Sequence, residues 1–153
     1  MTKLAVIRIR GNIGLSQDKR DTLTLLKLYN KNYCAVVDSN SSYIGMLTKV
    51  KDYVTWGELN QDTFCSLLKE RGRFAANKKF TEDSLKKQTI DEFGKEFFEN
   101  KKSLKDIPGL KQFFRLRPPV HGFERGGIKK PFSLGGVLGY RKDRINNLLM
   151  RMI

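Results

Sequence analysis

The chain has 153 residues and a formal net charge of +14 at pH 7, from 30 Lys and Arg against 16 Asp and Glu. It contains no apolar run of about 18 residues, no secretion signal and no lipidation motif, so we expect a cytoplasmic protein that neither spans nor is anchored to a membrane. A basic, soluble composition of this kind favours a polyanionic partner, and nucleic acid is the first candidate.

The N-terminal part of the chain begins with a strand, a helix and a second strand. Residues 3–9 alternate between two apolar faces, which predicts a strand. After a glycine break, Ser16 is placed to cap a helix with a leucine-rich side that ends near residue 29. Residues 34–38 are a short β-branched run and predict the second strand.

A second helix and a third strand follow. The loop at residues 38–42 is expected to supply a serine cap, and Ile44, Leu47, Val50 and Val54 recur at helical spacing. Residues 53–59 are rich in aromatic and β-branched types and predict the third strand. The order β-α-β-α-β indicates a layered sheet with helices packed on a face.

The next part of the chain, residues 60–113, is expected to form a helical extension. Asn60 begins one helix, which Gly72 closes. Thr89-Ile-Asp-Glu92 matches a capping box at the start of another helix.

The C-terminal third carries most of the net charge. From residue 101 onward there are 13 Lys and Arg against three acidic residues. Residues 114–140 hold six of the 13 glycines and three of the four prolines, a composition that predicts a flexible, extended segment that orders on a polyanion. Residues 141–153 end in an apolar stripe that predicts a final helix.

The sequence gives no support for a catalytic, metal or cofactor site. His121 is the only histidine, and no phosphate-binding Gly-x-x-x-x-Gly-Lys-Ser/Thr motif is present. Arg10-Gly-Asn12 faintly resembles the arginine and asparagine of an acylphosphatase-type site, which leaves an enzyme for a phosphorylated small molecule as a remote alternative. We therefore expect no enzyme activity, no cofactor and no small-molecule substrate.

Three groups of basic residues are candidates for nucleic-acid contact, because cations bind phosphates and aromatic rings stack on unpaired bases. The first group lies in residues 113–125, and a solvated tail is its alternative interpretation. The second lies in residues 8–20, where ordinary surface charge is the alternative. The third comprises Lys49, Lys51 and Trp56, although a tryptophan is more often a core residue than a stacking platform.

Two blocks of sequence resemble a known family. The run Gly45-Met-Leu-Thr-Lys-Val-Lys-Asp-Tyr-Val-Thr-Trp-Gly-Glu58 is similar to the hallmark segment of the L-thirty family of large-subunit ribosomal proteins. Residues 114–119, 127–132 and 135–139 are similar to its archaeal and eukaryotic branch. The resemblance covers nearly the whole chain and favours the archaeal type, although relatives more often place a basic or glycine residue after the prolines of Arg117-Pro-Pro-Val-His121.

The resemblance implies an α+β fold with a ferredoxin-like β-α-β-α-β core, in which a three-stranded antiparallel sheet carries two helices on one face. It implies a structural role in the large ribosomal subunit, with large-subunit rRNA, 5S rRNA and neighbouring ribosomal proteins as partners. In the family the first strand-helix junction and the hallmark segment face RNA, which carries onto Arg10, Asn12, Arg20, Met46, Lys49 and Lys51.

The expected organisation is a core at residues 1–59, a helical extension at 60–113, a basic RNA-binding segment at 114–140 and a C-terminal helix at 141–153. A non-ribosomal RNA-binding protein or ribosome-assembly factor with the same fold is the alternative function. The predicted RNA-binding residues are Arg8, Arg10, Asn12, Lys19, Arg20, Met46, Lys49, Lys51, Arg115, Arg117, His121, Phe123, Arg125, Lys129 and Lys130.

Overall fold

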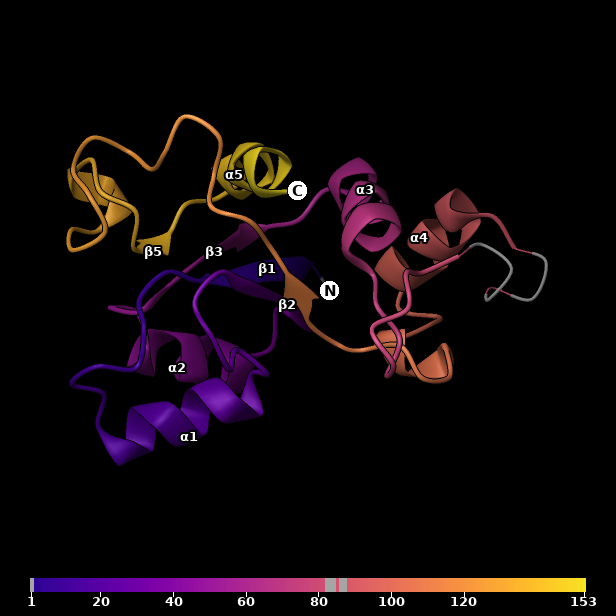
Figure 1. The fold of residues 1–153 in the computed structure, drawn as a ribbon, viewed down its shortest axis with the longest axis horizontal. Coiled ribbons are helices and arrows are strands. Elements are labelled where there is room, and N and C mark those ends of the chain that lie inside the picture. Colours follow the sequence, from indigo (N-terminus) through magenta and orange to yellow (C-terminus); the bar gives the residue numbers. More distant parts are fainter. Residues whose placement is uncertain (1, 82–84, 86–87) are drawn as a thin grey trace.

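A mixed five-stranded sheet in the order β4-β2-β1-β3-β5 forms the centre of the molecule (Figure 1). The computed structural model describes residues 2–81, 85 and 88–153. In chain order the strands are β1 (Lys3–Arg8), β2 (Tyr33–Asp38), β3 (Val54–Glu58), β4 (Phe114–Arg115) and β5 (Gly139–Tyr140). All the pairings are antiparallel except that of β5 with β3. The sheet is wider than the predicted three strands, because the C-terminal region adds a short strand at each edge.

One face of the sheet is covered by α1 (Gln17–Leu25) and α2 (Ser41–Lys49), below the sheet in Figure 1. Leu4 and Val6 point from β1 into this layer and pack with the apolar side chains of both helices. The alternation predicted for the first strand therefore sets the two sides of the sheet, since neighbouring residues of a strand face opposite ways.

The opposite face is covered by α3 (Gln61–Arg71) and α5 (Arg144–Met152), and α4 (Ile90–Phe98) packs against α3, to its right in Figure 1. Ala5 and Ile7 of β1 belong to this core. Phe64 of α3 stacks on Phe97 of α4 with ring centroids 4.4 Å apart, which joins these two helices of the helical extension to each other.

The basic segment at residues 114–140 is part of the folded body. Phe114, Leu116, Val137 and Leu138 are buried in the same core as α3 and α5. Composition alone indicates a flexible segment, whereas the structure anchors the segment to the sheet at both of its ends. Its few apolar side chains follow no helical or strand period, but they lie at the two places where the segment joins the sheet.

Most of the predicted helix ends are confirmed. Asn60 and Gly72 flank α3, and Thr89 forms the predicted capping box with Glu92. The predicted serine cap of α2 is wrong, because Asn40 occupies that position. Two turns of 3-10 helix, at Leu104–Asp106 and Phe132–Leu134, lay outside the sequence prediction.

The start of α5 lies directly on β3 at Gly57. A Cβ atom at this position would come 2.1 Å from the carbonyl oxygen of Lys142 and 3.0 Å from the side chain of Ile145. Gly57→Ala is therefore expected to lower the free energy of unfolding by about 1–3 kcal/mol, because the backbone of α5 would have to move away.

Gly45→Ala is the matched control, because a Cβ atom at this exposed position in α2 meets nothing within 4 Å. It should raise the free energy of unfolding by about 0.5–1 kcal/mol, since alanine favours a helix over glycine. Urea denaturation of the two variants measures both effects. Equal stabilities of Gly57→Ala and wild type would contradict the close packing of α5.

Candidate nucleic-acid interface

The loop between β1 and α1 is held from inside by Arg8. This side chain is only 2% exposed. Its Nη1 donates to the carbonyl oxygens of Leu28 at 2.8 Å and Tyr29 at 2.9 Å, and its Nε donates to that of Arg10 at 2.9 Å. Its Nη2 donates to Oδ1 of Asn12. Because these donors are taken up inside the protein, we assign Arg8 to positioning of the loop and not to contact with a ligand.

Tyr53 organises the cations around this loop. The guanidinium of Arg10 lies 5.2 Å from the centroid of the Tyr53 ring, and Nζ of Lys19 lies 5.3 Å from it. The main-chain N–H groups of Ile9 and Arg10 both donate to the Tyr53 carbonyl oxygen. The tyrosine thus joins the loop after β1 to the turn before β3, a role that the sequence prediction missed because Tyr53 had been counted as a strand residue.

Five further predicted residues come from the same loop, from α1 and α2, and from the turn before β3. Asn12, Arg20, Lys49 and Lys51 are exposed, whereas Met46 is half-buried against the core between α1, α2 and the sheet. Met46 therefore supports the fold more than it offers contact area. We call the remaining group the loop surface: Arg10, Asn12, Lys19, Arg20, Lys49 and Lys51.

The second basic group is a hairpin at residues 124–138, fastened by Arg141. The Arg141 side chain is 1% exposed and forms an ion pair with Glu124, with Nη1 2.8 Å from Oε1. Its Nη2 donates to the Val137 carbonyl oxygen at 2.8 Å, and its Nε donates to Oγ1 of Thr55 in β3 at 2.9 Å. One buried arginine therefore ties both arms of the hairpin to the sheet.

The hairpin presents Arg125, Lys129 and Lys130 to solvent, and we call these three residues the hairpin surface. A Cβ atom on Gly136 would lie 2.1 Å from the carbonyl oxygen of Lys130. The absence of a side chain at Gly136 therefore lets the two arms of the hairpin approach each other closely.

The other predicted residues of the segment lie elsewhere. Arg115 is exposed on β4, with its guanidinium 5.7 Å from the ring centroid of Tyr33. Arg117 and His121 are exposed on the stretch that passes the C-terminal end of α5, where the Arg117 N–H donates to the Met152 carbonyl oxygen. Phe123 is half-buried and packs on the core. The structure does not place these four residues in one group with the hairpin surface.

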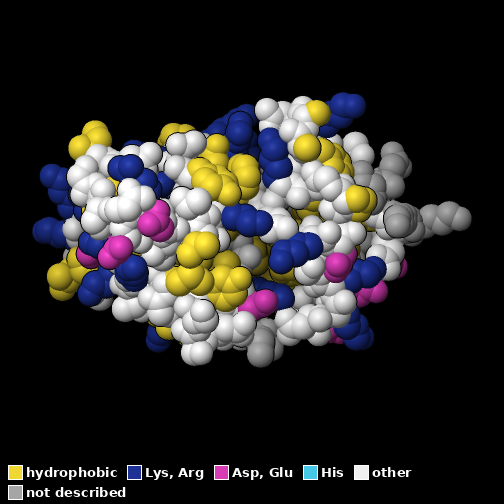
Figure 2. Space-filling view, turned by 90° about the horizontal axis from the view of Figure 1, so that it is seen from below, with side chains coloured by type: hydrophobic (Ala, Val, Ile, Leu, Met, Phe, Trp, Pro, Cys, Tyr) yellow, Lys and Arg dark blue, Asp and Glu magenta, His cyan; other side chains and the backbone are white. Residues whose placement is uncertain are grey.

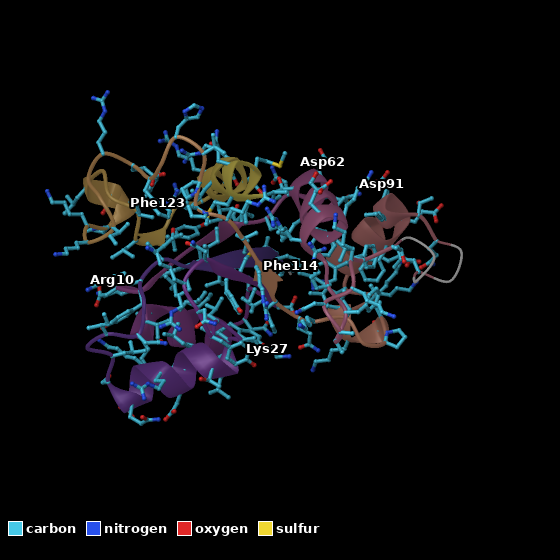
Figure 3. The ribbon with its side chains drawn as sticks, in the orientation of Figure 1. Arg10, Lys27, Asp62, Asp91, Phe114 and Phe123 are labelled. Atoms are coloured by element: carbon cyan, nitrogen blue, oxygen red, sulfur yellow. The ribbon has the colours of Figure 1, made fainter. Side chains whose placement is uncertain are left out.

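The loop and hairpin surfaces lie at the same end of the molecule. Figure 2, seen from the α1 side, shows Lys and Arg side chains over the whole face, several of them at its left-hand end together with a few acidic ones. In Figure 3, Arg10 lies at this end, beneath the hairpin and beside the loop that leads to α1. Two segments separated by about a hundred residues thus form one basic end.

Burial acts on both of the positioning arginines. It lowers the pKa of Arg8, and it lowers the pKa of Arg141 although the hydrogen bond to Glu124 opposes the change. Arginine remains charged despite such shifts. The fixed charges therefore hold the loop and the hairpin in place at any ordinary pH.

The described residues offer little for covalent or metal chemistry. Burial raises the pKa of the Cys34 thiol to about 12, so the thiolate that would act as a nucleophile does not form near neutral pH. Among the described residues there is no group of three His, Cys, Asp or Glu side chains that could hold a metal ion. Asn12 Oδ1 accepts a hydrogen bond from Arg8, so the asparagine oxygen that would position water in an acylphosphatase-type site is already engaged inside the loop.

Comparisons with known proteins place this chain in a family. The family described as ribosomal protein L30p/L7e matches residues 4–54. A large ribosomal subunit protein uL30 from Methanopyrus kandleri is 49% identical over 149 residues, which is 95% of this chain and all of the relative. The chain belongs to the L30p/L7e family. Proteins of the same name from Methanococcus vannielii and Nanoarchaeum equitans are 46% and 44% identical, over 97% and 100% of this chain and 98% and 100% of their own lengths.

Membership of the L30p/L7e family confirms the resemblance drawn from the hallmark segment and the C-terminal blocks. It is a family of structural, non-enzymatic ribosomal proteins, and the relatives compared above are archaeal. Within the described residues, no helix is both long and apolar enough to cross a membrane.

Proposed function

We propose that this chain is a structural constituent of the large ribosomal subunit that binds large-subunit rRNA through its loop and hairpin surfaces. The observation that carries the proposal is the placement of these two surfaces at the same end of the molecule, each fastened by a buried arginine. The name of the relatives, large ribosomal subunit protein uL30, supports the ribosomal setting.

The mechanism is electrostatic docking of a preformed surface. Lys and Arg side chains neutralise phosphates and release counterions, so affinity falls steeply with salt. Because double-stranded RNA is recognised mainly by shape and backbone, and sequence is read chiefly at unpaired bases, we expect weak sequence preference at the basic end. Since the hairpin is already folded, less ordering is needed on binding than for a disordered tail.

The finer assignments follow from the family resemblance. The β1-α1-β2-α2-β3 order and the antiparallel pairing of β1 with both neighbours support a ferredoxin-like core at residues 1–59. The division into 60–113, 114–140 and 141–153 and the proximity to 5S rRNA and to neighbouring ribosomal proteins are part of the proposal. A crosslinking map of the assembled subunit would test each of these contacts.

A non-ribosomal RNA-binding protein or assembly factor with this fold remains the alternative function. Mature large subunits, pelleted after a moderate salt wash, are expected to retain one copy of this protein each, because a structural constituent is stoichiometric. Quantitative mass spectrometry of the pellet measures the ratio, with an established large-subunit protein as internal standard. Substoichiometric recovery, or recovery from precursor particles alone, would favour the assembly factor.

A further inference from the structure

Ile13 is an apolar side chain that the structure holds almost completely in solvent. It is 97% exposed at the tip of the loop between β1 and α1. Single exposed hydrophobic residues are common on proteins, so exposure alone would carry little. The surroundings of Ile13 make it unusual.

The loop cannot fold back to bury this side chain. Asn12 on one side accepts the hydrogen bond from the buried guanidinium of Arg8. Leu15 on the other side is buried, and its N–H donates to the Asn12 carbonyl oxygen at 3.3 Å, which closes a turn around Ile13. The same contacts that position the basic loop therefore point an isoleucine away from the protein.

The loop surface carries three cations on the same loop and helix start as Ile13. Arg10, Lys19 and Arg20 come from the same loop and the first turns of α1. An exposed apolar tip on the same loop and helix start as three cations matches a partner that carries both negative charge and flat apolar surface. Unpaired bases of RNA present such faces beside their phosphates, and apolar side chains are known to insert between bases at nucleic-acid interfaces.

We propose that Ile13 packs against the face of an unpaired rRNA base while the neighbouring cations bind the adjoining phosphates. This inference rests on the proposed function and adds a base contact to it. Ile13 supplies affinity that does not depend on counterion release, whereas Arg10, Lys19 and Arg20 supply the part that does.

The test compares Ile13→Ser with wild type in binding to two RNA probes, large-subunit rRNA and a fully paired RNA duplex, across a series of salt concentrations. For rRNA, Ile13→Ser is expected to bind about tenfold more weakly at every salt concentration, which is the scale of losing one buried aliphatic side chain. The slope of log affinity against log salt should stay unchanged. For the duplex, whose bases are paired and stacked, the two proteins should bind alike.

Leu25→Ser is the matched control, because Leu25 is 72% exposed on α1 and lies outside the loop surface. It should bind both probes as wild type does. Ile13→Val should retain most of the affinity for rRNA, since it removes only one methylene. Both serine variants should unfold at the wild-type temperature, because neither side chain is buried.

Wild-type affinity of Ile13→Ser for rRNA would overturn the inference, as would an equal loss on the duplex. A loss of subunit occupancy with unchanged rRNA binding would also overturn it, and would assign Ile13 to a protein neighbour. Failure of wild type to bind rRNA at all would contradict the proposed function itself, so the two failures are distinguishable.

Discussion

Replacing Arg141 with methionine is expected to lower the free energy of unfolding by about 3–5 kcal/mol, because it leaves the carboxylate of Glu124 without its buried partner. The carbonyl oxygen of Val137 and Oγ1 of Thr55 lose their donors as well. Methionine fills much of the arginine volume, so the change removes charge and hydrogen bonds more than packing. Arg141→Lys should restore little, since lysine lacks the forked donors that reach three partners at once.

Hydrogen exchange measures where in the molecule Arg141→Met lowers stability as well as by how much. The N–H groups of Gly126 and Val137 donate across the hairpin, to the carbonyl oxygens of Gly135 and Lys130, and their protection should fall in Arg141→Met. Protection in α1 and α2, on the other face of the sheet, should change least. Loss of protection confined to the hairpin would show that it opens as a unit of its own.

Arg144→Met is the matched control. Arg144 is exposed, lies three residues further along, and approaches the same Phe132 ring as Arg141, at 5.8 Å compared with 4.7 Å from the ring centroid. Arg144→Met should lower the free energy of unfolding by less than about 1 kcal/mol, because exposed charged contacts usually contribute no more than that. Wild-type protection of the hairpin amides in Arg141→Met would contradict the role assigned to Arg141.

The part of the fold that the sequence predicted is the part with a regular period. The alternation in residues 3–9 separates the two cores, and Thr89 with Glu92 marks the start of α4 through a local hydrogen-bond pattern. Signals of this kind lie within a few neighbouring residues. The packed structure keeps these local patterns, because the apolar face of the strand and the cap of the helix are what the core is built on.

The edge strands could not be predicted in this way. β4 and β5 are two residues long, too short to show any alternation, and they exist because distant strands offer free edges. Phe114 and Val137 consequently looked like isolated apolar residues in a basic segment, although both are fully buried. Their burial depends on partners 80 residues away in sequence.

In the candidate site, the sequence likewise does not show which charged residues are buried. Arg8 and Arg141 have no sequence feature that separates them from Arg10 or Arg125, yet the first two are buried, Arg10 is half-buried and Arg125 is exposed. The one available signal was Glu124, the only acidic residue in the segment 114–140. A single carboxylate in a basic segment is a reasonable place to look for an internal ion pair, and Glu124 does pair with Arg141.

The geometry of the basic end also predicts how RNA binding should respond to loss of charge. One triple variant removes the hairpin surface by changing Arg125, Lys129 and Lys130 to glutamine. A second triple variant removes half of the loop surface by changing Arg20, Lys49 and Lys51 to glutamine. If all six cations bind phosphates, each triple variant should lower the slope of log affinity against log salt by about two to three, since each lost contact changes it by about 0.7–0.9. Binding of rRNA at several salt concentrations measures the slopes.

A variant that combines both sets of three substitutions tests whether the loop and hairpin surfaces contact one RNA at the same time. Simultaneous contact predicts that the losses of slope add, because the surfaces belong to separate segments without shared ion pairs among the described residues. If each surface bound RNA only when the other was free, each triple alone would leave the slope almost unchanged.

A third triple variant separates a specific surface from net charge. Lys78, Lys79 and Lys95 are exposed in the helical extension, and changing them to glutamine removes the same three charges. This variant should keep a slope within about one unit of the wild-type value, because its lysines lie far from the basic end and screening is strong beyond about 10 Å. An equal fall in slope for all three triples would mean that RNA responds to the total charge of the chain. The meeting of loop and hairpin would then have no special part in binding.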